Sequence, residues 1–348
     1  MKRTRQRAAA ADGVDGSPGM RTTLAAIAAQ AGVSTATVSK VLNGRSDVAT
    51  ATRDRVHRIL VESNYVPQKR SSDVVDLIFS ELDSPWAVEI LRGVERHMSA
   101  HGRAVAVSAV SGDGPTRPPS WTGTIARQHP AGVMLVTSQL TARQWRQLHA
   151  QGIPLVVIDP ANLPDPELPS VGATNWAGGI AATEHLLQQG HKRIATISGP
   201  QEYLCSRARI DGYRHALEQN GHRFDPALVR WGDFRQEGGY HWASDLLGRR
   251  SPPTAIFAGN DQQALGVYEA ARQLGLAIPR DLSVVGFDDL PLARWLPPPL
   301  TTVCQPLADM GAMAAEMLLR LMDNRPLPTR RVELATELVV RESTAAPT

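Results

Sequence analysis

The sequence predicts a small all-α module at its N-terminus, followed by an α/β body of two Rossmann-like lobes. Short helical patterns separated by a glycine-containing turn fill residues 22–65. After Pro67, short apolar runs alternate with amphipathic stretches, which is typical of a parallel sheet covered by helices on both faces. These strand-helix units are too numerous for one small sheet, and 348 residues with 42% hydrophobic content can build more than one core.

Three helices are expected in the N-terminal module. The first starts at Leu24, with Thr23 as its N-cap, and ends at Gly32, where a tight turn needs positive φ. Ser34 caps a second helix, and a third runs from about Thr50 to Ser63. Two short helices joined by a glycine-containing turn form the helix-turn-helix pattern.

The body divides into apolar runs and helical stretches in alternation. The expected strands are Val74–Phe79, Ala104–Val110, Val133–Val136, Leu155–Ile158, Ile194–Ile197, Ala255–Ala258 and Ser283–Phe287. The expected helices include Trp86–Ala100, Trp176–Gln189, Ser206–Asn220, Glu237–Leu247 and Gln262–Leu274. Polar residues, among them Asp159, Asn260 and Asp288, come directly after strands. Because ligands bind at the carboxyl ends of strands in open α/β sheets, a cleft between the lobes is the expected ligand site.

Charge is distributed unevenly along the chain. Residues 1–72 hold 12 Lys+Arg and 5 Asp+Glu, a balance of +7, whereas the other 276 hold 25 and 29, a balance of −4. A basic module on a mildly acidic body indicates a polyanion partner for the module, although a solvated basic tail has the same composition.

Composition also indicates the compartment. The two cysteines, Cys205 and Cys304, have no disulfide or metal-ligand spacing, which fits a reducing environment. No apolar run approaches the roughly 20 residues that span a bilayer. Residues 1–21 lack the apolar stretch of a secretory signal and are expected to be a disordered leader. A cytoplasmic protein without membrane contact is therefore expected.

Enzyme motifs are missing from the sequence. It contains no P-loop, no His-Glu-x-x-His and no Gly-x-Ser-x-Gly, and the pair Gly178-Gly179 stands at a helix start rather than in a dinucleotide fingerprint. His97 and His101 are four residues apart but have no third ligand nearby in the sequence, so surface histidines are the preferred interpretation. Neither catalysis, a cofactor nor a metal site is expected.

One segment is far more specific than composition. Residues 23–44 read TLAAIAAQAGVSTATVSKVLNG, and the pattern continues through Thr52-Arg53 and Asn64-Tyr65-Val66-Pro67. This segment resembles the DNA-reading module of the lactose-repressor (LacI/GalR) family. Further matches, such as Asn260–Gly266 and Val284–Asp289, extend the resemblance over roughly residues 22–344.

The resemblance implies a recognition helix that begins at Ser34 and enters the major groove. Thr35, Ala36 and Lys40 are the positions expected to face base edges. Phosphate contacts are expected from Ser34, Thr37, Ser39, Asn43 and Arg45. Thr23 and Tyr65 complete the candidate DNA-binding set. The alternative is a solvated helical hairpin that binds nothing.

The chain departs from the family pattern in three places. Ala26 and Ala49 stand where the family has an acidic residue and a capping Ser, which weakens two helix starts by about 1 kcal/mol each. The third departure is residues 68–73, a shortened basic hinge without the leucine that the family wedges into the minor groove. We hypothesise that Lys69 and Arg70 enter a narrow minor groove instead. A flexible linker with nonspecific phosphate contacts is the equal alternative.

The body, residues 74–344, resembles the family's effector and dimerisation domain, which is related to periplasmic sugar-binding proteins. The resemblance implies that the chain crosses between the lobes three times, and it places nine residues at the effector site: Asp83, Ser84, Trp86, Asp159, Arg209, Phe234, Asn260, Asp288 and Gln305. Carboxylate, amide and guanidinium groups suit sugar hydroxyls, and an aromatic face covers the apolar side of a sugar ring. A purely structural role is the alternative for four of these residues. Asp288 could cap a helix, Asn260 could be a turn residue, Trp86 could be a core or interface residue, and Arg209 could be a surface charge.

Together these observations predict a homodimeric, sequence-specific transcription regulator, with the helix-turn-helix over residues 22–67. A repressor released from a pseudo-palindromic operator by a small molecule, most simply a sugar, is the favoured form. A corepressor-dependent regulator would use the same parts. A solute-binding protein without a regulatory role is the alternative from another class, but it would need a signal peptide and no helix-turn-helix.

Overall fold

The computed structural model describes residues 24–42, 48–63, 74–109, 125, 130–137, 140–162 and 165–348. The chain divides into two compact units, Met1–Ser71 and Ser72–Thr348. Several sequence-based expectations lie outside the described residues: the leader, the hinge over residues 68–73, and the candidate DNA contacts Thr23, Asn43, Arg45, Tyr65, Lys69 and Arg70.

The first unit contains three helices, as predicted: α1 (Leu24–Ala31), α2 (Thr35–Leu42) and α3 (Thr50–Glu62). Gly32 has a φ of +63°, which fits the tight turn after α1. Ser34 Oγ accepts a hydrogen bond from the Thr37 backbone N–H at 3.1 Å and so caps α2. The helices enclose a small apolar core made of Ile27, Ala28, Ala31, Val38, Val41, Val48, Val56, Ile59 and Leu60.

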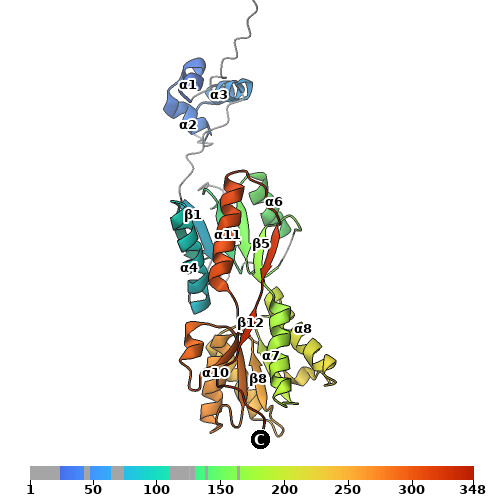
Figure 1. Ribbon diagram of the computed structural model, residues 1–348. Coiled ribbons are helices and arrows are strands. Elements are labelled where there is room, and N and C mark those ends of the chain that lie inside the picture. The colour runs from blue at the N-terminus through green and yellow to red at the C-terminus, as the bar shows by residue number, and fades with distance from the viewer. Residues whose placement is uncertain are drawn as a thin grey trace, which may run out of the picture. The chain divides into compact units, whose positions relative to one another are not determined.

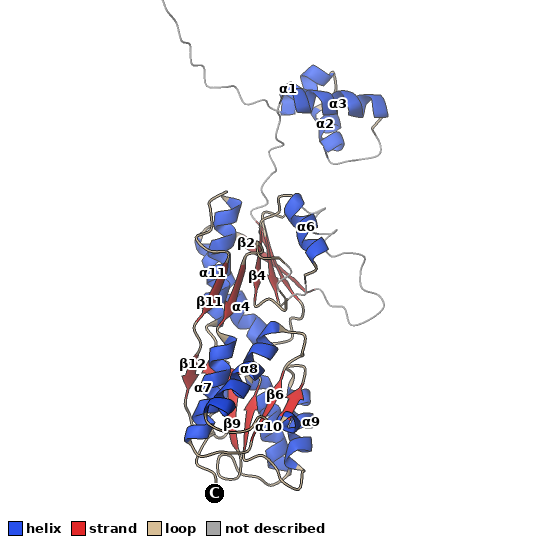
Figure 2. Ribbon diagram, turned by 90° about the vertical axis from the view of Figure 1, so that its right-hand side faces the viewer, coloured by secondary structure: helices blue, strands red, loops and turns tan. Residues whose placement is uncertain are grey.

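The second unit contains two sheets with helices on both faces (Figure 1), which confirms the predicted fold class. The strand order of the first sheet, here the N-lobe sheet, is β11-β5-β4-β3-β1-β2, and all its pairs are parallel. Its strands are β1 (Val74–Phe79), β2 (Ala104–Ala109), β3 (Val133–Val136), β4 (Leu155–Ile158), β5 (Ser170–Ala173) and β11 (Arg331–Leu334). Helices α4 (Pro85–Ala100) and α11 (Leu307–Met322) cover one face, and α6 (Ala142–Ala150) covers the other (Figure 2).

The second sheet, the C-lobe sheet, has the order β12-β10-β9-β8-β6-β7. Its strands are β6 (Ile194–Ser198), β7 (Val229–Trp231), β8 (Ala255–Ala258), β9 (Ser283–Asp288), β10 (Thr301–Cys304) and β12 (Glu337–Val339), the last being antiparallel to β10. Helices α7 (Asn175–Gln188) and α8 (Leu204–Gln219) pack on one face, and α9 (Gln236–Leu247) and α10 (Asp261–Gln273) on the other. The 3-10 turns η1 (Pro226–Leu228) and η2 (Pro291–Arg294) complete the lobe.

The described chain passes between the two sheets three times: after β5, after β10 and after β11. Each lobe is therefore discontinuous in sequence, as the resemblance implied. Five strands were not among those expected: β5, β7, β10, β11 and β12. Each is only three or four residues long, and none presents the uninterrupted apolar run that marks a buried strand, so the sequence pattern alone does not distinguish them from loops.

Helices α7 and α8 cross in close backbone contact at two glycines. A Cβ on Gly179 would clash with the Arg209 carbonyl oxygen, and a Cβ on Gly212 would clash with the Trp176 carbonyl oxygen. Because interiors are close-packed, the two helices can lie at this distance only without side chains at the crossing. The crossing also fixes Arg209, which lies one turn before Gly212 on α8.

We expect Gly212→Ala to force α7 and α8 apart and to lower the free energy of unfolding by roughly 1–3 kcal/mol. Chemical denaturation followed by circular dichroism measures this change. Gly172→Ala is the matched control, because a Cβ there meets no atom within 4 Å. Equal stability of the two variants would contradict the packing argument.

Candidate functional site

A cavity of about 640 Å³ lies between the two lobes, at the carboxyl ends of their strands. This volume is within the ~300–1,000 Å³ typical of small-molecule sites. Residues from both lobes line it: Phe79, Ser80, Glu81, Asp83, Ser84, Trp86, Ala87, Val136, Thr137 and Asp159 from the N-lobe, and Pro200, Tyr203, Arg209, Asp233, Phe234, Arg235, Asn260, Gln262 and Asp288 from the C-lobe.

Eight of the nine residues expected at the effector site line this cavity. The ninth, Gln305, differs from expectation: it is 3% exposed and does not line the cavity. Its Oε1 instead accepts a hydrogen bond from Arg209 Nη2 at 3.0 Å. Gln305 therefore helps to hold Arg209, a residue of the cavity wall, from the crossover between β10 and α11.

Arg209 is fixed in the cavity wall by hydrogen bonds and by stacking on an aromatic ring. Its side chain is only 3% exposed, so the alternative that Arg209 is a surface charge is wrong. Its Nε donates to Asn175 Oδ1 at 2.8 Å, its Nη1 donates to the Gly259 carbonyl, and its guanidinium stacks on the Phe287 ring at 3.7 Å. A planar cation fixed in this way presents a preset hydrogen-bonding edge to a ligand.

The Asp288 carboxyl group is the least satisfied group of the cavity. It is 3% exposed, and among the described residues its Oδ1 has no hydrogen-bond partner, since Arg209 Nη2 is 3.9 Å away. Burial raises the pKa of Asp288 well above its ordinary value, Arg209 opposes this shift, and the neighbouring carboxylates of Asp261 and Asp159 add to it. A buried oxygen without a partner is costly, so a ligand hydroxyl placed here would be stabilised.

Asp159, at the end of β4, faces the same cavity from the N-lobe. It is 7% exposed, and burial raises the pKa of its carboxyl group while Arg209 lowers it. Asp159, Asp288 and Phe234 all have positive φ, at 45°, 109° and 65°. Non-glycine residues in this conformation store strain and gather at ligand sites, which agrees with their place in the cavity.

Asn260 and Phe234 are linked to each other. Asn260 caps α10 by accepting from the Gln263 backbone N–H at 2.8 Å, and its Nδ2 donates to the Phe234 carbonyl at 3.0 Å. The turn-residue alternative thus describes part of what Asn260 does, because both ends of its side chain hold the backbone. Asn260 still lines the cavity, and it fixes the loop that carries the Phe234 ring.

Two contacts at the cavity rim join the lobes directly. Arg235 of the C-lobe pairs with Glu81 and Asp83 of the N-lobe, and Ser84 Oγ lies 2.9 Å from Gln262 Oε1. Arg235 and Gln262 were not predicted from the sequence, although Arg235 directly follows Phe234 and Gln262 lies two residues after Asn260. Ser84 also caps α4 by accepting from the Trp86 backbone N–H.

The candidate DNA contacts that the structure describes gather on α2. Val38 and Val41 are buried in the core of the first unit, which leaves Thr35, Ala36 and Lys40 exposed. Ser34 is exposed as well, and Thr37 and Ser39 are half-buried. The helix thus presents the predicted base-facing positions to solvent, as a recognition helix must.

Comparison with known proteins gives two family matches. Residues 23–68 match the bacterial regulatory proteins of the lacI family, and residues 183–344 match the periplasmic binding protein-like domain. The HTH-type transcriptional regulator CelR of Thermobifida fusca is 35% identical over 337 residues, which cover 93% of this chain and 98% of CelR. The chain belongs to the lacI family of bacterial regulatory proteins. This lacI-family protein is accordingly a DNA-binding transcription regulator.

Other relatives and solved structures agree. The transcriptional repressor CytR of Escherichia coli K12 is 33% identical to this lacI-family chain, covering 93% of it and 96% of CytR. A structure of a CelR–cellobiose complex has 36% identity and a TM-score of 0.73, covering 93% of this chain and 100% of that one. A lac repressor dimer bound to operator and the anti-inducer ONPF has 28% identity and a TM-score of 0.70, covering 94% and 100%. These named relatives are regulators rather than enzymes.

None of the helices in the described part of the chain has the length and apolar character needed to cross a bilayer.

Asp261, the first residue of α10, is a buried acid that was not among the site residues predicted from the sequence. It is 0% exposed, its Oδ2 accepts from the Leu290 backbone N–H at 2.7 Å, and its Oδ1 accepts from the Thr302 hydroxyl at 2.6 Å. These bonds fix the loop that follows Asp288. Burial raises the pKa of Asp261 to about 7, although the hydrogen bonds from Thr302 and Leu290 lower it.

This pKa makes stability depend on pH. The folded pKa of about 7 lies above the ordinary value of 3.8, so between these pH values the folded chain binds a proton that the unfolded chain has released. Relative to Asp261→Asn, the wild-type free energy of unfolding should fall as pH rises through this window, by up to about 4 kcal/mol. Urea unfolding of both proteins at several pH values measures it. A constant difference between them across the window would contradict the assignment.

Proposed function

We propose that this regulator is a homodimeric repressor that binds a pseudo-palindromic operator in the cytoplasm and is released from it by a sugar. The observation that carries the proposal is Asp288, a residue that lines the cavity and whose buried Oδ1 has no hydrogen-bond partner among the described residues. It lies beside the preset guanidinium of Arg209. Neighbouring acceptor and donor groups suit the vicinal hydroxyls of a sugar ring.

The rest of the cavity favours the same ligand class. Phe234 and Trp86 supply aromatic surface, and Asp159 supplies a second carboxyl group. Aromatic faces bind the apolar side of a sugar ring, and a few polar groups set its orientation. A volume of about 640 Å³ leaves room for two pyranose rings. Since the CelR structure holds cellobiose, a disaccharide of this kind is the first effector to test.

Dimeric DNA binding is supported by two features. Helix α2 exposes Thr35, Ala36 and Lys40, and a relative of known structure is a dimer on its operator. Trp295, at the end of η2, is 85% exposed, which is unusual for an isolated surface and typical of a protein interface. A two-fold dimer would present two recognition helices to two half-sites.

Release follows from linkage between ligand and lobe arrangement. The rim contacts of Arg235 with Glu81 and Asp83 are solvent-exposed ion pairs, which contribute little to stability. The lobes can therefore change their relative pose at low cost, and a ligand in the cavity selects one pose. If that pose disfavours operator binding, the operator must weaken ligand binding by the same factor.

The proposal is tested by fluorescence anisotropy on DNA from the gene's upstream region, at fixed salt. The protein is titrated first, and cellobiose and a panel of other mono- and disaccharides follow. Selective binding that one sugar releases is the expected result, and Lys40→Ala provides the DNA-binding control. A sugar that tightens binding would establish a corepressor instead. Selective DNA binding that no sugar alters would contradict the sugar effector.

Asp288→Asn preserves the shape of the side chain but removes its ionisable carboxyl group and one acceptor oxygen. A hydrogen bond to a charged group contributes about 1.5–3 kcal/mol, so the sugar concentration needed for half-release should rise about ten- to a hundredfold. Operator affinity without sugar should stay near the wild-type value. Asp211→Asn, on the exposed side of α8, is the matched control. Unchanged sugar release in Asp288→Asn would remove Asp288 from the ligand site.

A further inference from the structure

A second cluster of ligand-type side chains lies on the N-lobe, outside the cavity. It consists of His97, on the last turn of α4, His101, directly after α4, and Glu316, on α11. One ligand atom from each of the three lies within 4.8 Å of the other two. The sequence showed the two histidines four residues apart but gave no third ligand, which the packing of α11 supplies.

The third ligand is brought there by a close helix crossing. A Cβ on Gly93 of α4 would clash with the Ala308 carbonyl oxygen, and a Cβ on Gly311 of α11 would clash with the Ile90 carbonyl oxygen. The two backbones therefore touch about one helical turn before His97 and Glu316. Their side chains extend from a rigid pair of helices, which is the support that a metal site needs.

Hydrogen bonding already prepares His101 as a ligand. Its Nδ1 lies 2.8 Å from the His97 carbonyl oxygen, so Nδ1 carries the proton and donates. The neutral ring then has its lone pair on Nε2. A metal-bound histidine characteristically donates its other ring N–H to a backbone carbonyl or a carboxylate in this way.

The side chains of His97 and Glu316 lie close together, but His97 Nε2 lacks a well-formed hydrogen bond to Glu316. His97 Nε2 is buried and has no hydrogen-bond partner in the described part of the chain, and Glu316 Oε2 is 3.4 Å away. Glu316 Oε1 accepts from Arg320 Nε at 2.8 Å, which leaves Oε2 available.

We propose that His97, His101 and Glu316 form a binding site for a divalent transition metal of the zinc class. Two imidazoles and one carboxylate are a donor set that Zn²⁺ binds, with water in the fourth position of a tetrahedron. A bound ion would hold the donors at about 2.0–2.2 Å, so the three side chains, whose donor atoms lie within 4.8 Å of one another, would turn toward it on binding. Arg320 then supports the carboxylate by holding its second oxygen.

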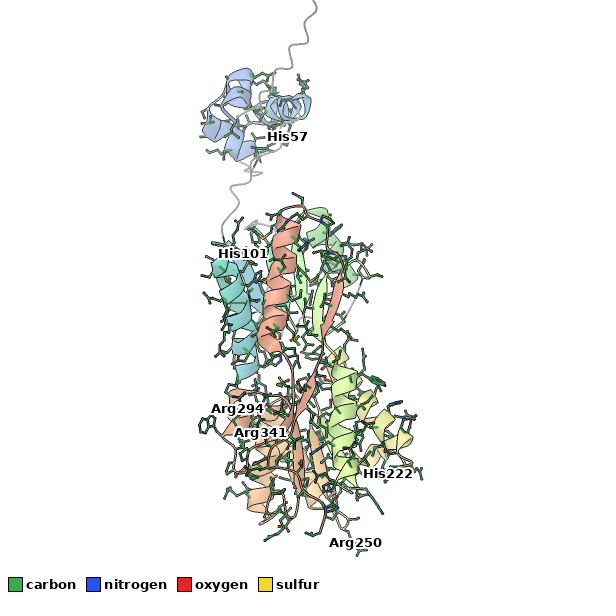
Figure 3. All side chains as sticks on the ribbon, in the orientation of Figure 1. His57, His101, His222, Arg250, Arg294 and Arg341 are labelled. Carbon is green, nitrogen blue, oxygen red and sulfur yellow. The ribbon has the colours of Figure 1, made fainter. Side chains whose placement is uncertain are left out.

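The ion joins α4 to α11 at the end of the lobe away from the effector cavity. Helix α4 begins at the cavity with Ser84 and Trp86, and it ends at this site. His101 (Figure 3) lies three residues before Ala104, which pairs with Val74 at the start of β1. Metal binding therefore stabilises the part of the N-lobe at which the described chain enters the body.

The test uses the full chain, without a histidine tag and dialysed against a chelator, titrated with Co²⁺ and then with Zn²⁺. One Co²⁺ per chain should bind with the visible absorption of a tetrahedral N/O site, and Zn²⁺ should displace it. His97→Gln/His101→Gln and, separately, Glu316→Gln should each weaken binding by about tenfold or more. His222→Gln, which alters a C-lobe histidine, should bind as wild type does (Figure 3).

Thermal unfolding gives an independent readout. Zn²⁺ should raise the unfolding temperature of the wild type and of His222→Gln but not of the double variant, because an ion that binds only the folded chain stabilises it. Equal unfolding temperatures of all variants without metal show that each one folds. Binding without saturation, or binding that survives in both ligand variants, overturns the proposal.

Discussion

The effector domain depends on one buried cation. The guanidinium of Arg209 is buried, and a buried N–H that lacks an acceptor is costly. Its acceptors come from three parts of the chain: Asn175 after the first crossover, Gly259 at the end of β8, and Gln305 on the second crossover. The hydrogen bonds of this one guanidinium therefore link two of the three interlobe connections to the C-lobe sheet.

The remaining crossover is fixed by a smaller polar contact. Thr336, between β11 and β12, exchanges hydrogen bonds with Thr174, just before α7. The crossovers are thus bound to one another by short, partly buried hydrogen bonds, whereas the rim on the other side of the cavity is bridged by exposed ion pairs. Because exposed pairs are weak, the lobes can open at the rim while the crossovers keep their arrangement. This asymmetry is what a hinge requires.

Much of this arrangement could be predicted from the sequence. The helices of the first unit follow from apolar periodicity and the Ser34 cap, and polar residues after strands located Asp159, Asn260 and Asp288 in one cavity. What could not be predicted depends on long-range packing. Nothing local places Glu316 beside His97, since 219 positions separate them and the Gly93–Gly311 crossing decides the contact. Gln305 was selected correctly as a crossover residue, but which side of Arg209 it occupies depends on the fold of both lobes.

The loop after β9 shows why ligand, charge and stability are connected. Asp288 faces the cavity, while Asp261 holds the backbone two residues further on. The Asp261 carboxylate raises the pKa of Asp288, so the pair resists being doubly charged. A hydroxyl ligand that donates to Asp288 would favour its ionised form, against the effect of the neighbouring Asp261 carboxylate. Asp261 thus connects the start of α10 to β10, and β10 leads directly into the crossover that supports Arg209.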